Sequence, residues 1–504
     1  MIRRLPMLRT NAVWPVAILA IVALDVPVAI IAATRSGDYR LLFAVAVGAA
    51  LVASSLRWPA TGMVLTLVAF LPFMALIRRL LIAPAGWSSY DPLLLVGPVA
   101  AAALLARVFL VERRPLVTDR LSRLVLGLLL LTLVEVVNPF GSGLTAGLGG
   151  LLFLAIPVLW FLIGRDLMSR WNARVVLRGA VFVSVVVACY GLWQSQVGLP
   201  TWDRSWVSIA GYSSLNLGGN TLRSFGTLSS SAEYASYLQV GLAVSLALLA
   251  HRRWAYALAA PILLVALFLD STRGAMVSLV VVVIVLISLR QPTTRRALLA
   301  ILAGLLVAVG TQTLLAGRLA ATAAHSTNRA VSHQLGGLSN PFNPKQSTLL
   351  IHAQLVVSGF QAGVSNPVGH GTGSTNLAGA KFGSASAAAS SPQNSELDIS
   401  NAFISSGLVG GLLYLTVVIL ALRRAVCAYR RTEDPIVLAA TLVLVSGLGQ
   451  WLTGGQYAVA PLMWTLIGWT STEFLATVGL SEPTRRHGWS AGAPAQLVRA
   501  RLSS

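Results

Sequence analysis

The chain has 504 residues, of which 56% are hydrophobic and 11% charged, and its mean hydropathy is +0.76. A soluble domain carries about 25% charged residues, so this composition excludes an ordinary soluble protein. Apolar runs of about 17–25 residues, the length that crosses a bilayer, recur along the chain. The alternating short strands of an outer-membrane barrel are not the pattern seen. We therefore expect an all-α, polytopic transmembrane helix bundle.

The formal charge of +21 would suggest a nucleic-acid partner in a soluble protein. Here it follows from arginines at the cytoplasmic ends of membrane helices, so we expect the lipid bilayer as partner and no nucleic acid. With both termini cytoplasmic, 26 of the 37 basic residues fall inside and 11 outside. The opposite orientation would reverse this bias. We expect a multi-pass protein of the cell inner (plasma) membrane.

About 14 spans are predicted, and the first is expected to be an uncleaved helix. They begin near Val13, Leu41, Ala60, Leu93, Leu121, Gly147, Val175, Ala232, Trp254, Gly274, Ala297, Asn401, Ile436 and Tyr457.

Residues 1–480 are predicted to form a single bundle, and residues 481–504 a flexible cytoplasmic tail. Two long segments break the pattern of tight turns. They are residues 198–231 and 317–400, the second between the eleventh and twelfth spans, and both are expected outside the cytoplasm. Loops of this length are often functional. Because both lie on one side, we expect the activity there.

Two of the outward arginines lie in short Gly/Ser-rich settings at helix ends. Arg223 precedes a span within TLRSFGTLSSSAEYASYL, and Arg273 lies in the turn LFLDSTRGAMV. A single arginine at a membrane surface can simply reach lipid phosphates. Two together predict an anion site, because guanidinium groups bind phosphate through paired donors. Asp270 would orient Arg273 or cap the turn.

The stretch SELDISNAFISSGLVGG contains the only acidic residues of the segment 317–400, Glu396 and Asp398. Two residues apart, they point in different directions on a helix. Asp398 is expected to cap the span that begins near Asn401, a contribution of about 1 kcal/mol. Glu396 is left as a candidate general base for an acceptor hydroxyl.

Other polar residues have a structural and a functional interpretation. His352 lies on an apolar helical stretch and is expected to pack there, and the turn around His370, HGTG, is interpreted as a backbone requirement for glycine rather than a phosphate loop. The outward residues Arg78 and Arg79 are interpreted as an anchor for the third span. Asp25 and Glu135 fall inside predicted spans, where an ionisable group is either functional or paired within the bundle.

Four stretches, in this order and topology, resemble the O-antigen ligase and O-antigen polymerase superfamily of bacterial membrane glycosyltransferases, over roughly residues 120–475. They are RSFGTLSSSAEYASYL, DSTRGAMVSL, NPVGHGTGST and ELDISNAFISSGLVGGLLYL. The family's ligases place a His-Asn pair eleven residues before a glycine that corresponds to Gly407. This chain has Glu396 at that position, which favours a polymerase over a ligase.

The resemblance implies transfer of a glycan from a polyprenyl-pyrophosphate donor to a hydroxyl of a glycan or glycolipid acceptor, with inversion and without a metal or other cofactor. Arg223 and Arg273 would bind the pyrophosphate, and Glu396 would accept the proton. Two other classes stay open. A lipid-linked sugar transporter would show an internal repeat and a site at the midplane, and a membrane scaffold would leave the outward arginines unexplained.

Overall fold

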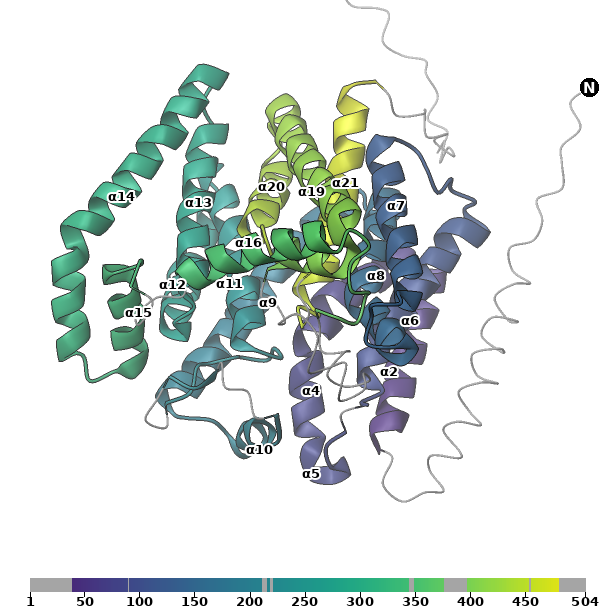
Figure 1. The fold of residues 1–504 in the computed structure, drawn as a ribbon, viewed down its shortest axis with the longest axis horizontal. Coiled ribbons are helices and arrows are strands. Elements are labelled where there is room, and N and C mark those ends of the chain that lie inside the picture. The colour runs from purple at the N-terminus through teal and green to yellow at the C-terminus, as the bar shows by residue number, and fades with distance from the viewer. Residues whose placement is uncertain are drawn as a thin grey trace, which may run out of the picture.

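The computed structural model is a bundle of helices (Figure 1). The residues it describes contain no β-strand, only an isolated bridge between Asn216 and Leu222. The described ranges are residues 39–88, 90–210, 215–217, 221–343, 349–375, 397–452 and 455–479. Asp25, the predicted first span, Glu396 and the predicted tail lie outside them.

Within the described residues, eight helical stretches are long and apolar enough to cross a membrane. They are α2 (Tyr39–Arg57), Pro59–Leu80, Leu93–Val111, α8 (Leu144–Leu167), α9 (Arg170–Gln196), α11 (Ser231–Ala250), α14 (Thr294–His325) and α19 (Asp398–Thr432). The stretch Pro59–Leu80 begins as α3 (Pro59–Val64) and ends as α4 (Met74–Leu80), and Leu93–Val111 begins as α6 (Leu93–Ala106). A π-helical segment interrupts or ends each of these two stretches.

Shorter or less apolar helices complete the bundle. They are α5 (Ile82–Ala85), α7 (Arg120–Val134), α12 (Ala259–Asp270), α13 (Arg273–Leu289), α20 (Pro435–Ser446) and α21 (Val459–Thr477). Each span predicted after Val13 begins within five residues of a helix start in this structure. Hydropathy alone therefore located the helices, whereas the number that cross a membrane stays a prediction.

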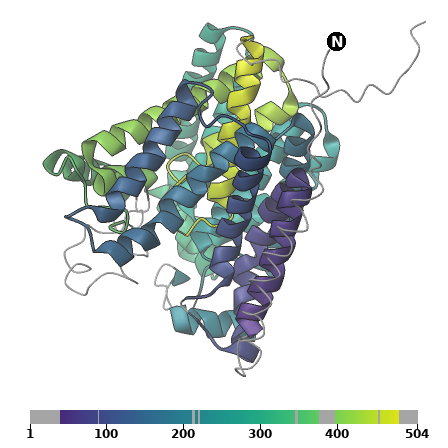
Figure 2. The same cartoon turned by 90° about the vertical axis from the view of Figure 1, so that its right-hand side faces the viewer.

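The helices differ greatly in how much of their surface the bundle covers. In α11, 83% of the most apolar window is buried, while none of the corresponding window of α14 is. Small residues let neighbours approach α11 closely: a Cβ on Gly241 would lie 2.6 Å from the side chain of Ser184 on α9. In Figure 1, α14 stands at one edge of the molecule, and in Figure 2 the purple α2 stands at another.

The two segments predicted as long loops contain helices of their own. Residues 198–231 include α10 (Thr201–Ala210), and residues 317–400 include the end of α14, then α15 (Arg329–Ser339) and α16 (Leu349–Ser365). The helix α16 lies across α19 (Figure 1), where Ser400 Oγ donates to the carbonyl of Leu355 at 2.7 Å. These segments are therefore largely structured parts of the fold.

Candidate functional site

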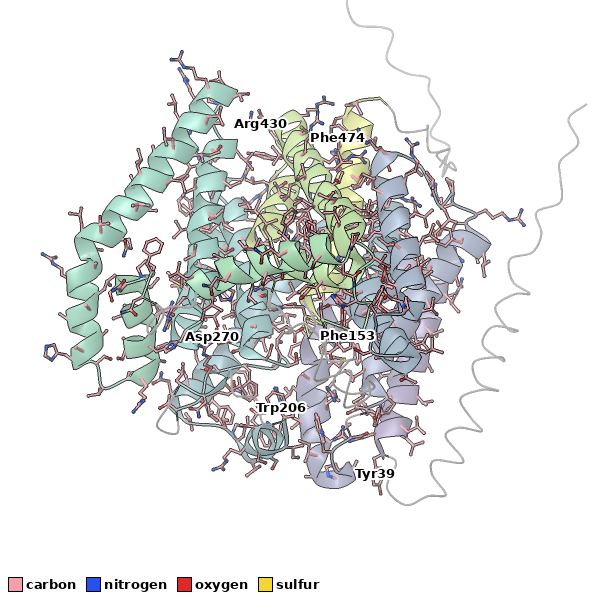
Figure 3. All side chains as sticks on the ribbon, viewed as in Figure 1. Tyr39, Phe153, Trp206, Asp270, Arg430 and Phe474 are labelled. Atoms are coloured by element: carbon pink, nitrogen blue, oxygen red, sulfur yellow. The ribbon has the colours of Figure 1, made fainter. Side chains whose placement is uncertain are left out.

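The two arginines singled out in the sequence come together in space. Arg223 follows the short bridge at Leu222, and its backbone N–H donates to the carbonyl of Leu215 at 2.7 Å. Arg273 is the first residue of α13, which packs on α11. Their charges are close enough to act on each other, and Asp270 interacts electrostatically with Arg223. Figure 3 shows Asp270 in the half of the bundle away from Arg430 and Phe474.

The charges of this arginine site are not balanced. Asp270 is fully buried and interacts electrostatically with Arg223. The Nε of Arg223 is buried and has no hydrogen-bond partner among the described residues. Arg223 interacts with both the Asp270 carboxylate and the second guanidinium, Arg273, so two positive charges meet one negative charge, and partly burying uncompensated charge is costly. The arrangement is therefore suited to binding an anion.

The helix α15 covers the arginine site. Arg273 Nη2 lies 2.9 Å from the ring Nε2 of His333 and donates to the His333 carbonyl at 2.9 Å. A Cβ on Gly337, one turn further along, would lie 2.1 Å from Arg273 Nε, so the missing side chain makes room for the guanidinium. Ser271 Oγ also donates to the carbonyl of Ala330 at 2.6 Å. These contacts hold α15 against the turn between α12 and α13.

His333 is a site residue that the sequence analysis missed. Burial, together with the positive charges of Arg273 and Arg223, lowers the pKa of His333 to about 4. Its imidazole is therefore neutral at physiological pH. The adjacent Gln334 is fully buried, and neither of its amide atoms has a described hydrogen-bond partner. The signal available in the sequence was a histidine on a short polar helix within the outer segment.

A second arginine fixes the backbone that carries Arg223. Arg79 is 1% exposed, pairs with Asp203 at 2.8 Å, and donates to the carbonyls of Leu228 and Gly226 at 2.6 and 2.7 Å. Gln194 Oε1 accepts from the backbone N–H of Gly226 at 2.8 Å. The sequence interpretation of Arg79 as an anchor for the third span is refined, because its guanidinium is buried and joins the end of that span to Asp203 and to the Arg223 segment.

Arg78 is likewise buried rather than at a lipid surface. Its Nε lies 3.0 Å from Asp91, a carboxylate that Arg40 also contacts. Glu135, predicted within a span, lies just after α7 and accepts from Asn138 Nδ2 at 2.5 Å. Both residues serve connections within the bundle.

Glu233, which the sequence analysis did not select, connects the Arg223 segment to the start of α21. One carboxylate oxygen accepts from the backbone and side chain of Ser229 at 3.1 and 2.5 Å, and the other accepts from the N–H of Ala458 at 2.8 Å. Its signal was present in the sequence: Ser230 caps α11 by accepting from the N–H of Glu233 at 3.1 Å, the spacing of a capping box.

The capping role predicted for Asp398 is wrong. The helix α19 begins at Asp398 itself, its N-cap residue is Leu397, and no side chain makes the cap bond. The buried Asp398 carboxylate instead accepts from Tyr414 Oη at 2.5 Å and from the backbone N–H of Trp451 at 2.6 Å. Asp398 thus joins α19 to the segment after α20, a contact between positions far apart in sequence.

The HGTG turn has the structural role expected for its glycines. Gly371 of the turn has positive φ, as do Gly369 before it and Gly407 opposite, and a Cβ on Gly373 would lie 2.7 Å from the carbonyl of Ala146. The N–H groups of His370 and Gly371 donate to the carbonyls of Ile404 and Ser405 at 2.9 Å each. These bonds match a break in the helical backbone of α19 at Ser406 and Gly407. The backbone donors of His370 and Gly371 are therefore already used.

None of the contacts given for the described arginine site involves the remaining predicted residues. His370 is half-buried, and burial lowers its pKa. His352 is on α16, the helix that packs on α19. Glu396 lies outside the described residues, one residue before Leu397.

The described residues form a helical bundle with stretches able to cross a membrane, and they bring two half-buried arginines, Arg223 and Arg273, close together. No protein-family model matches the chain, and no curated protein has significant similarity to it.

Proposed function

We propose that the protein is a membrane glycosyltransferase of the O-antigen ligase/polymerase type. It transfers a glycan from a polyprenyl-pyrophosphate donor to a sugar hydroxyl outside the cytoplasm, in the synthesis of a surface or exopolysaccharide. The observation that carries this proposal is the meeting of Arg223 and Arg273 from separate segments, with a net positive charge beside Asp270. The order of the four sequence stretches supplies the class of reaction.

In this proposal the arginines bind the donor pyrophosphate and stabilise the charge that develops on it. Guanidinium groups present fixed pairs of donors to phosphate oxygens, and such preorganised donors lower the barrier most where charge appears in the transition state. The acceptor oxygen forms the new glycosidic bond as the bond from the anomeric carbon to the pyrophosphate breaks. The pyrophosphate leaves with the bonding electron pair, and the anomeric centre is inverted.

A base must take the proton of the attacking hydroxyl, and two residues are candidates. Glu396 corresponds in spacing to the family's histidine position. His333 contacts Arg273 Nη2 at 2.9 Å and is neutral at physiological pH, so it can accept a hydrogen bond. A pKa of about 4 makes it a weak base in this closed arrangement. We therefore favour Glu396 and assign His333 to positioning Arg273.

We favour a polymerase, with both termini cytoplasmic and the reaction at the opposite face of the plasma membrane. A ligase with another acceptor is the closest alternative, since the two differ only in the molecule that supplies the hydroxyl. A transporter of the lipid-linked glycan would use the same anion site without cleaving the donor. One experiment separates these functions.

The test is glycan profiling of cells that lack the gene, complemented with wild type, Glu396→Gln or His333→Gln. A polymerase using Glu396 predicts loss of long chains, accumulation of single lipid-linked repeats, and rescue by wild type and His333→Gln but not by Glu396→Gln. Long lipid-linked chains that never reach their acceptor would instead indicate a ligase. Unchanged outer glycans, or donor retained on the cytoplasmic face, would refute glycosyl transfer.

A further inference from the structure

A pocket lies between α6, α8 and α21, in a part of the bundle that the proposed transfer does not use. Its walls are apolar and include Pro98, Phe153, Ile156 and Trp160, and its cavity volume is about 70 Å³. Pro98 lies inside α6 and Pro157 inside α8. A proline within a helix removes a backbone hydrogen bond and bends the helix, which keeps these neighbours apart.

The pocket opens sideways from the bundle. Leu152 lines it, is 39% exposed, and belongs to α8, one of the helices able to cross a membrane. Figure 3 labels Phe153, the next residue along this helix, near mid-height of the bundle in that view. In a membrane the surface beside Leu152 faces lipid chains, so a chain could enter without crossing water.

One end of the pocket carries an unsatisfied polar atom. Gln456, in the segment before α21, lines the pocket and is 5% exposed. Its Nε2 donates to Ser236 Oγ at 3.3 Å and lies 3.5 Å from Gln450 Oε1, which fixes the orientation of the amide. Its Oε1 is buried without a hydrogen-bond partner in the described structure. A buried acceptor left unpaired costs about 1–3 kcal/mol, so this oxygen calls for a donor from a ligand.

The charges nearby decide which kind of donor fits. None of the described residues that line the pocket is charged. The closest ionisable group along the hydrogen-bond network is Glu233, whose carboxylate receives the N–H of Ala458, two residues after Gln456. A phosphate or carboxylate head group would find no cation here and would be repelled by Glu233.

We propose that this pocket binds a membrane lipid by one apolar chain, with a neutral hydrogen-bond donor of that lipid, a hydroxyl or amide N–H, on Gln456 Oε1. Because Gln456 precedes α21 on the side predicted to face outside, the lipid comes from the outer leaflet, with its polar end at Gln456 and its chain among α6, α8 and α21. The site is separate from the arginine site and does not require that the protein transfer sugars.

The test uses the full-length protein in phosphatidylcholine nanodiscs with trace amounts of a monoacylglycerol that carries a photoreactive diazirine in its chain. The methyl ester of the same chain is the matched probe without a donor, and the primary amide of the same chain distinguishes an N–H donor from a hydroxyl. Crosslinked peptides are identified by mass spectrometry. Wild type is expected to be labelled on α6, α8 and α21 more strongly by the monoacylglycerol or amide than by the ester.

Three variants give the test its controls. Gln456→Leu should lower labelling by the donor-bearing probes about threefold to tenfold and leave labelling by the ester unchanged. Ile156→Trp fills the pocket and should abolish labelling there by all probes. Leu148→Trp, at an exposed position of the same helix, should change neither the labelling by the donor-bearing probes nor the labelling by the ester. Thermal unfolding identifies any variant that is misfolded, and the filled and acceptor-deleted variants test the site independently.

Equal labelling by the ester and by both donor-bearing probes, unchanged in Gln456→Leu, would mean an adventitious lipid only and would overturn the proposal. Labelling that persists on α8 in Ile156→Trp would also overturn the proposal. Loss of glycosyl transfer in an Arg273 variant with normal labelling would leave this proposal intact, so the two proposals fail separately.

Discussion

Arg79 and Arg223 belong to neighbouring parts of the fold but differ in how completely their charges are matched. Arg79 has Asp203 as its ion-pair partner at 2.8 Å and two backbone carbonyls as acceptors. Arg223 has a buried Nε without a described partner, and its charged neighbours are Asp270 and a second arginine, Arg273. The same residue type is therefore satisfied by the protein in one place and left unsatisfied in the other.

This difference separates a structural arginine from a binding one. A buried guanidinium whose acceptors all come from the protein is part of the fold, and removing it leaves its partners unpaired. One that lacks acceptors lowers the stability of the empty protein and is stabilised by a bound anion. Burial alone would have selected Arg79, the more buried of the two, as the functional residue. The inventory of partners selects Arg223, with Arg273 as its cationic neighbour.

The largest expected effect is the loss of activity when the arginine pair is broken. Arg273→Ala and Arg223→Ala should each lower glycan transfer at least about 100-fold, because each removes donors that stabilise the departing pyrophosphate. Arg223→Ala should not lower the yield of folded protein, since it relieves repulsion between two cations. Arg273→Ala relieves the same repulsion but also removes the bonds to His333, so its thermal unfolding is measured beside its activity. Transfer is measured with purified protein and a lipid-pyrophosphate donor.

The exposed Arg204 on α10 provides the matched control for this test. Arg204→Ala removes a charge from the same end of the bundle and should leave transfer unchanged. Full activity in Arg273→Ala would contradict the assignment of the anion site. Arg273→Lys keeps the charge but loses the fork of donors, so we expect only partial activity.

Arg79→Ala should mainly lower stability, whereas the variants of Arg223 and Arg273 mainly lower activity. The expected loss is about 3–5 kcal/mol, because Asp203 would be buried without its counter-ion. Thermal unfolding of the purified protein measures this loss. Replacing both partners, Arg79→Met with Asp203→Leu, should recover part of it, since the uncompensated charge is gone. Wild-type thermal stability in Arg79→Ala would mean that the pair is dispensable and that the contrast between the two arginines fails.

A smaller effect is expected at Asp398, and it distinguishes a capping role from a tertiary one. An amide accepts the bonds from Tyr414 and Trp451 less strongly than a carboxylate, so Asp398→Asn should cost about 1–3 kcal/mol. Asp434 is a true N-cap, accepting from the N–H of Ile436 at 2.7 Å. Asparagine caps as well as aspartate does, so Asp434→Asn should have a stability close to that of wild type. Equal losses in the two variants would refute the tertiary role.

The sequence was sufficient for some features of the structure and not for others, for identifiable reasons. Helix positions follow from runs of apolar residues, which are local, and the predicted span starts agree with the structure. The pairing of Arg79 with Asp203 and of Asp398 with Trp451 joins positions far apart in the chain. A single sequence contains no pattern for such pairs.

The two arginines of the candidate site could be predicted from the sequence, but the helix α15 that packs on them could not. Arg223 and Arg273 were identifiable because the predicted topology places them outside the cytoplasm, against the general bias of the basic residues of this chain. The polar helix α15 gave no hydropathy signal, and the segment that contains it was interpreted as a loop. Its contacts through His333 and Gly337 depend on how that segment folds back.

The smallest expected effect is a pH dependence of the stability of the folded protein, which comes from His333 on α15. The pKa of His333 is lowered to about 4 in the folded protein, against an ordinary value of 6.5. Between these values the unfolded chain binds a proton at His333 that the folded protein does not, so stability rises with pH in this window. The contribution of neutral His333 to the stability of the folded protein is fully present above pH 6.5 and is lost as the pH falls toward about 4. His333→Gln should remove this part of the dependence.

The measurement is the difference in melting temperature between wild type and His333→Gln at a series of pH values. The difference should be constant above pH 6.5 and should change in favour of the variant in acid, because only wild type then carries an imidazolium beside Arg273. His325, on the exposed end of α14, is the control, and His325→Gln should follow the wild-type curve. A constant difference at every pH would show that His333 does not contact the arginines, and α15 would then lie open over an accessible anion site.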